Sequence, residues 1–119
     1  MRLLKSHEAK LMKTLLMKNS SLAKLFLPLL DTVLVEDADD GGMGGLRFMS
    51  HINNADRTIG QKVAETDFID EDGVLVSVEL SLDNNNQLFE LDVWKVDYSP
   101  LCRNELSRTN ISHVNKLGR

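Results

Sequence analysis

The sequence predicts an α+β domain in which an N-terminal pair of helices packs on an antiparallel β-meander of about four or five strands. Two observations lead to this prediction. Leu11, Met12, Leu15 and Leu16 follow helical spacing and form one apolar stripe. After residue 30 the apolar period changes to two, most clearly over residues 74–82, where Val and Leu alternate with other residues. Short turns between successive strands are typical of a meander.

The first helix is expected to begin at Ser6, a residue type that caps helices, with Glu8 in the first turn, where the helix dipole favours an acid. Residues 19–21 (Asn-Ser-Ser) end this helix and offer a cap for a second one over about 22–27. Pro28 stops the second helix, because proline disfavours helical geometry in the preceding residue.

The strands are expected at 32–35, 46–49, 62–69, 74–82 and 87–97, of which 62–69 alternates only loosely. The intervening tracts are rich in turn residues: EDADDGGMGG at 36–45, the Asp-Gly turn at 70–73 and the Asn-rich turn at 83–86. In the last strand, Phe89, Leu91 and Val93 are expected on one face, and Trp94 on the other. Residues 1–101 are expected to form the single domain, and 102–119 a polar tail with a possible helix over 103–108 or 110–117.

The charge of the chain is distributed in blocks. Residues 1–30 carry a net charge of +5, residues 31–97 carry −12, and residues 98–119 carry +3, within a total of −4. An acidic centre of this size repels nucleic acid and attracts a basic protein at long range. A solvated acidic surface that aids solubility is the simpler alternative.

No catalytic or metal-binding constellation is recognisable. His7, His51 and His113 have no metal-ligand spacing, and the Asp/Gly tract fails the calcium-loop pattern because Gly41 and Phe48 fall at ligand positions. The glycines are not followed by a phosphate-binding lysine. We therefore expect no enzyme activity, no metal and no cofactor.

The lone Cys102 excludes an internal disulfide, and lysines interrupt every apolar run near the start. These features predict a cytoplasmic protein that contacts neither membrane nor nucleic acid. The sequence leaves the oligomeric state open.

Two segments resemble a small bacterial family of immunity proteins from contact-dependent growth inhibition and related polymorphic toxin systems. They are LDTVLVEDADDGGMGGLRF at 30–48 and LFELDVWKVDYSPL at 88–101. The resemblance implies a compact α+β domain that binds and neutralises a cognate toxin domain, with a nuclease as the expected class of toxin. An acidic inhibitor can cover the electropositive site that a nuclease needs for its phosphate backbone.

The candidate partner-binding residues are the carboxylates of the Asp/Gly tract and of the predicted strands, together with one aromatic residue: Glu36, Asp37, Asp39, Asp40, Glu65, Asp67, Glu90, Asp92, Trp94 and Asp97. Each carboxylate has the alternative of facing solvent or forming a turn. Trp94 is either an interface anchor or a core residue under the helices. Two other functions stay open: an enzyme or metal-dependent domain using the Asp/Gly tract, and a structural or regulatory module whose oligomer interface is the last strand.

Overall fold

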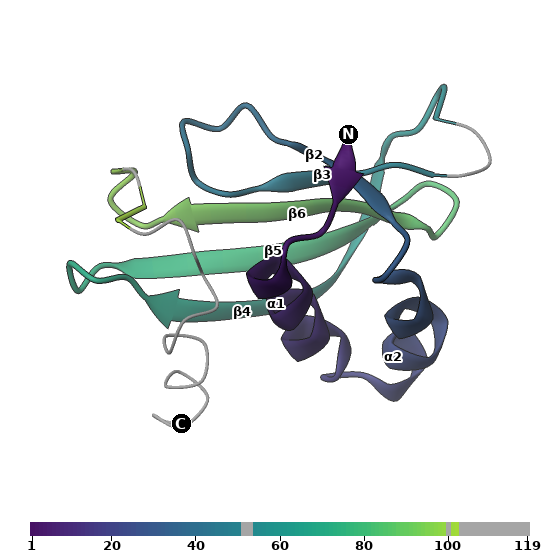
Figure 1. Cartoon of the computed structure of the whole chain (residues 1–119), viewed down its shortest axis with the longest axis horizontal. Coiled ribbons are helices and arrows are strands. Elements are labelled where there is room, and N and C mark those ends of the chain that lie inside the picture. Colours follow the sequence, from purple (N-terminus) through teal and green to yellow (C-terminus); the bar gives the residue numbers. More distant parts are fainter. Residues whose placement is uncertain (51–53, 100, 103–119) are drawn as a thin grey trace.

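The fold is α+β, as the sequence predicts, with two helices on a six-stranded antiparallel sheet (Figure 1). The computed structural model describes residues 1–50, 54–99 and 101–102. The helices are α1 (Ser6–Leu16) and α2 (Ser20–Phe26), and α2 continues into the short 3-10 helix η1 (Leu27–Leu29). The strands are β1 (Arg2–Leu3), β2 (Leu34–Asp37), β3 (Leu46–Phe48), β4 (Ile59–Ile69), β5 (Leu75–Asp83) and β6 (Leu88–Lys95).

The strand order is β1-β2-β3-β6-β5-β4. The sheet is therefore two three-stranded meanders joined side by side, because β3 pairs with β6 and not with β4. This order places the last strand in the interior of the sheet and leaves β1 and β4 at its edges. The sheet has more strands than the four or five expected, since the two-residue β1 is too short to carry a period.

One face of the sheet carries the core. Leu11, Met12, Leu15 and Leu16 of α1 are almost completely buried. They belong to one cluster with the inward-facing residues of the central strands, Val76, Val78, Leu80, Leu91 and Val93. Burying each such side chain contributes about 1.5–3 kcal/mol relative to leaving it exposed.

Both helices begin near the expected residues, although the capping differs. Ser6 is the first residue of α1 and Lys5 holds the N-cap position, where the Glu8 carboxylate accepts a hydrogen bond from the Lys5 amide at 2.8 Å. The Asn19 side chain caps α2 by accepting from the amides of Ser21 and Leu22.

Two strand predictions shift along the chain. The strand expected at 32–35 lies at Leu34–Asp37, because Thr32 and Val33 close the turn after η1 through their amides on the Leu29 carbonyl. The strand expected from residue 62 begins at Ile59, and two irregularities in its register with β5 hide its alternation. The helix considered over 103–108 or 110–117 lies outside the described residues.

The faces of β6 are also corrected at one position. Between Ser81 and Leu82 the register shifts, so that Leu82 pairs with Leu88. Leu88 therefore joins the core cluster, and Phe89 does not. Phe89 is still buried, because the guanidinium groups of Arg47 and Arg57 lie over its ring, 4.5 Å and 5.1 Å from the centroid.

Arg57 ties three segments together. It donates to Asp83 at 2.8 Å, to the Phe48 carbonyl at 2.8 Å and to the Leu88 carbonyl at 2.7 Å. The Arg57 and Asp83 side chains are 5% and 2% exposed, so this ion pair is shielded from water. Breaking a buried pair by removing one partner leaves an uncompensated charge.

We expect Arg57→Ala to lower the free energy of unfolding by about 3–5 kcal/mol, because Asp83 is left buried without its cation. Urea denaturation measures this value. Arg47→Ala is the matched control, since Arg47 also stacks on Phe89 but is exposed, and it is expected to cost less than about 1 kcal/mol. Equal losses in the two variants would contradict the buried-pair argument.

We expect acid to destabilise the fold through Asp83. Burial raises the pKa of this carboxyl, but hydrogen bonds from the Gln87 amide and Arg57 outweigh burial and hold the pKa below its ordinary value. The stability that Asp83 confers is fully present above about pH 4, the ordinary pKa of Asp, and is lost as the pH falls through the lower folded value. Urea denaturation across this range should show a stability difference between the native chain and Asp83→Asn that shrinks with falling pH. A constant difference would contradict the prediction.

Candidate functional site

No helix among the described residues lies over the second face of the sheet, and we call it the open face. Cross-strand pairing arranges its side chains in rows. One row runs Glu36–Arg47–Glu90–Ser81 across β2, β3, β6 and β5. The next row is Asp92–Glu79–Glu65, and the third is Trp94–Ser77–Asp67. These residues lie opposite the core because their neighbours Val76, Val78 and Leu91 face inward.

The middle row of the open face sets three carboxylates against one another. Glu79 is the direct cross-strand partner of both Asp92 and Glu65. Like charges in this position are destabilising. Lys62 offsets part of the repulsion, since its ammonium lies 2.9 Å from Glu65 and 3.4 Å from Glu79.

Asp92 has no ion-pair partner among the described residues. Desolvation by its surroundings, followed by the charges of Glu79 and Asp40, raises the pKa of this carboxyl. The row therefore stores electrostatic repulsion that a cationic partner would relieve.

A hollow of about 390 Å³ forms where the loop after β2 meets the open face, and we call it the acidic hollow. Six of the ten predicted residues line it: Glu36, Asp37, Asp39, Asp40, Glu90 and Asp92. Arg47 is the basic residue in its wall. The Asp/Gly tract and β6, far apart in sequence, thus contribute to one site.

Asp40, an acid of the loop in this hollow, also has a structural role. The Asp40 carboxylate accepts from the amides of Met43 and Gly45, at 3.0 Å and 2.9 Å, and so holds the loop in shape. Gly45 permits the close approach, since a Cβ there would lie 2.6 Å from that carboxylate and 3.0 Å from the Leu91 carbonyl.

Asp37 pairs with Arg2 at 2.7 Å, and Arg2 also bonds Glu8 of α1. The hydrogen bond from Arg2 lowers the pKa of Asp37. Asp37 thereby joins β1, β2 and α1, whereas Asp39 is an exposed acid of the same loop.

A second hollow of about 400 Å³ lies at the β4 side of the open face. Three predicted residues line it, Glu65, Asp67 and Trp94, together with Glu79 and Lys18. Trp94 is half-buried here and does not lie beneath the helices, so the predicted position in the core is wrong. Asp97 lies apart from both hollows, in the turn after β6, where it accepts from the amide and hydroxyl of Ser99.

Sequence reasoning missed Glu79, which lies at the centre of the acidic row. The signal was present in the strict alternation of residues 74–82, which puts Glu79 with Ser77 and Ser81 on the polar face. Sequence reasoning also missed Arg47 in the wall of the acidic hollow and Lys62 beside Glu65 and Glu79. Their neighbours on adjacent strands depend on the register of the sheet and not on the local sequence.

Three side chains that could offer ligand atoms to a metal ion lie around Lys95. Asp70, Asp72 and Cys102 lie within 4.8 Å of one another. The Lys95 ammonium lies 3.0 Å from Asp70, 2.6 Å from Asp72 and 3.7 Å from the Cys102 sulfur. Burial lowers the pKa of Lys95, but its hydrogen bonds to Asp72 and Asp70 outweigh burial and raise it. The ammonium of Lys95 thus occupies the space between these side chains and offsets one of the two carboxylate charges.

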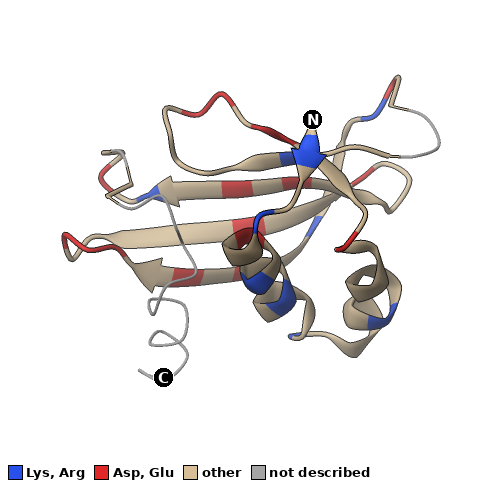
Figure 2. Cartoon of the chain, viewed as in Figure 1, with Lys and Arg blue, Asp and Glu red and all other residues tan. Residues whose placement is uncertain are grey.

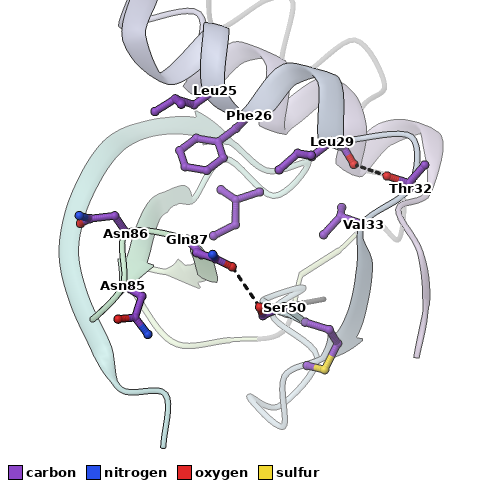
Figure 3. Close-up of a pocket in the computed structure, with 11 residues that line it drawn as sticks. Leu25, Phe26, Leu29, Thr32, Val33, Ser50, Asn85, Asn86 and Gln87 are labelled. Carbon is purple, nitrogen blue, oxygen red and sulfur yellow. Dashed lines mark hydrogen bonds between the residues drawn. The ribbon is translucent and has the colours of Figure 1, made fainter. Parts of the chain in front are cut away.

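An apolar pocket of about 240 Å³ lies at the other end of the molecule, between α2 and the β5–β6 turn (Figure 3). Phe26, Leu29 and Val33 form its apolar wall. Its polar rim includes the hydrogen bond from Ser50 to Gln87, at 3.0 Å. None of the described residues that line it is charged, so it is chemically distinct from the open face.

The helices carry charge of the opposite sign. Figure 2 shows basic residues on α1 and α2 and acidic residues on the strands and on the loop after β2. Lys10, Lys13 and Lys24 are exposed on these helices. Neither helix among the described residues is long and apolar enough to cross a membrane.

We expect Asp92→Asn to stabilise the fold at neutral pH by a few tenths of a kcal/mol, because it removes a like charge from an exposed row that solvent partly screens. The folded pKa of Asp92 is raised, so its ionisation costs stability as the pH rises above about 4, and the gain in Asp92→Asn should vanish below that pH. Urea denaturation at neutral pH and below about pH 4 measures the stability difference between the native chain and Asp92→Asn. Asp39→Asn, in the loop, is the control. A loss of stability at neutral pH would contradict the repulsion argument.

A family model described as Domain of unknown function (DUF6984) matches residues 1–105. Neither the curated proteins nor the solved structures contain a match. The family match includes both helices, all six strands and both hollows of the open face. The chain belongs to this family of proteins with the DUF6984 domain.

Proposed function

We propose that this protein is a binding module of the immunity type, which attaches to a basic surface of a cognate toxin domain through its open face and neutralises the toxin. The observation that carries the proposal is the uncovered row Asp92–Glu79–Glu65, in which like charges are direct neighbours. A row that lowers the stability of the free chain is useful where a partner supplies the missing positive charge.

The layout of the open face supports a protein partner. The acidic hollow provides the charges that attract a basic protein over a distance and accelerate association. Trp94 lies in the second hollow, and tryptophan is enriched among the residues that dominate binding energy at interfaces. The proposal therefore divides the face into a steering end and an anchoring end.

The resemblance to immunity proteins of contact-dependent growth inhibition, on residues 30–48 and 88–101, supplies the class of partner. These segments contain the loop acids and the β6 acids that line the acidic hollow. A nuclease is the proposed class of toxin, because its phosphate-binding site is necessarily electropositive. We also propose that the protein acts in the cytoplasm and without catalysis, supported by the lone Cys102 and the absence of a recognisable catalytic motif in the sequence.

The other two functions gain no specific support. Two of the carboxylates that a metal would need in this tract already have partners, since Asp40 accepts from backbone amides and Asp37 pairs with Arg2. A structural module assembled by pairing along the last strand is disfavoured, because β6 is paired on both sides.

The test is association with the toxin domain encoded beside this protein, measured by surface-immobilised binding kinetics at low and high salt. We expect Asp92→Lys to slow association several-fold at low salt, with a smaller effect at high salt, because salt screens steering. Asp92 is preferred to Asp37 or Asp40, whose replacement would disturb the Arg2 network or the loop.

Asp31→Lys is the matched control, since it makes the same change in net charge at an exposed position outside the open face. It should leave the association rate close to that of the native chain. If Asp31→Lys and Asp92→Lys slowed association equally, the net charge of the chain and not the open face would determine the association rate. No association of the native chain at low salt would refute the proposed function.

A further inference from the structure

Among the described residues, the free edge of β4 is the longest strand edge without a neighbour. β4 is one of the two edge strands of the sheet and pairs only with β5 (Figure 1). Its first part has an irregular register, but residues 64–69 pair with β5 without interruption. Irregular pairing is a common protection of exposed edges, and the regular part lacks it.

The direction of the backbone groups along this regular part follows from two hydrogen bonds. The Asp70 amide bonds the Val74 carbonyl across the turn, and the Val96 amide bonds the Leu75 carbonyl from the β6 side. In an antiparallel pair, residues alternate between bonding the neighbour and pointing away from it. Glu65, Asp67 and Ile69 therefore direct their amide and carbonyl groups away from β5.

These outward groups have no hydrogen-bond partner among the described residues. They present a template for one more strand. The side chains of Glu65 and Asp67 lie beside this template on the open face, and both are exposed.

The charge of the edge discriminates between occupants. Antiparallel pairing of two copies of β4, centred on residues 65–67, would set carboxylates against carboxylates, which is unfavourable. A strand with Lys or Arg at alternate positions would instead place its cations next to Glu65 and Asp67. The two acids thus oppose self-pairing and favour a basic strand.

We infer that the regular edge of β4, residues 64–69, accepts an extended basic segment of the partner protein as a seventh strand of the sheet. The inference rests on the proposed function, because it assigns the segment through which the basic partner is held. The backbone of Glu65, Asp67 and Ile69 supplies the hydrogen bonds, and the carboxylates of Glu65 and Asp67 select the charge.

The test uses the full chain and a short capped peptide of alternating lysine and threonine, observed by amide hydrogen exchange in NMR. In the free protein, the amides of Glu65, Asp67 and Ile69 should exchange faster than those of Thr66 and Phe68, which face β5. Addition of the peptide should slow exchange at the first three amides selectively. A peptide of alternating glutamate and threonine is the matched control and should have no effect.

The double variant Glu65→Lys with Asp67→Lys should prefer the glutamate peptide over the lysine peptide. We expect it to bind the lysine peptide at least about tenfold more weakly than the native chain does. The glutamate peptide should now slow exchange at the same three amides. Glu65→Gln with Asp67→Asn provides a milder second variant, in which both peptides should bind weakly. Sedimentation of the free chain should show no growth in mass with concentration.

Three results would overturn the inference: no binding of the lysine peptide, binding without protection of the three amides, or self-association through β4. The second result would leave the open face as a purely electrostatic surface. Because no toxin is used, failure here with normal toxin binding would refute only the added strand. Failure of toxin binding with normal peptide protection would refute only the proposed function.

Discussion

The arrangement of this protein depends on one constraint: its two short helices cover only one face of a six-stranded sheet. The apolar stripe of α1 packs on that face, so the central strands must present apolar residues there at every second position. The alternate positions then face solvent and are available for charge. Acidic residues fill most of them, and the lysines of α1 and α2 lie on the other side of the molecule.

The rows of the open face require a fixed register as well as alternation. A slip of one residue between β5 and β6 would separate Glu79 from Asp92 and turn core residues outward. The register is held at the β5–β6 turn, where Asp83 accepts from the Asn85 and Gln87 amides and from Arg57. A buried arginine at one end of the sheet thus supports the alignment of carboxylates along it.

The sequence was sufficient to predict the features that are local and periodic. The stripe in α1, the alternation of residues 74–82 and the turn at 70–73 each depend on neighbours within a few residues, so the fold class and most elements could be predicted. Among the candidate acids, Asp39 and Asp40 lie in the loop and four others lie in strands, as the sequence predicts, whereas Glu36 and Asp37 end β2 and Asp97 lies in the turn after β6. Their division into two hollows could not be predicted, because it depends on β6 pairing with β3 rather than only with β5.

The features that escaped prediction are those set by distant contacts. The place of Phe89 depends on a register shift between β5 and β6, and Glu79 becomes central only when β4 and β6 lie on either side of it. Arg2 of β1 reaches both Asp37 and Glu8, and no short-range pattern encodes these two contacts. Sequence reasoning is weakest where one residue serves segments far apart along the chain.

The position of Trp94 has a consequence for spectroscopy. It is the single tryptophan of the chain, and it lies on the open face rather than in the core. Its emission spectrum therefore originates at the open face, and occupation of that face by a protein would displace water from the indole and shift the emission to shorter wavelengths. The molecule carries an intrinsic fluorophore that reports occupancy of this face without any label.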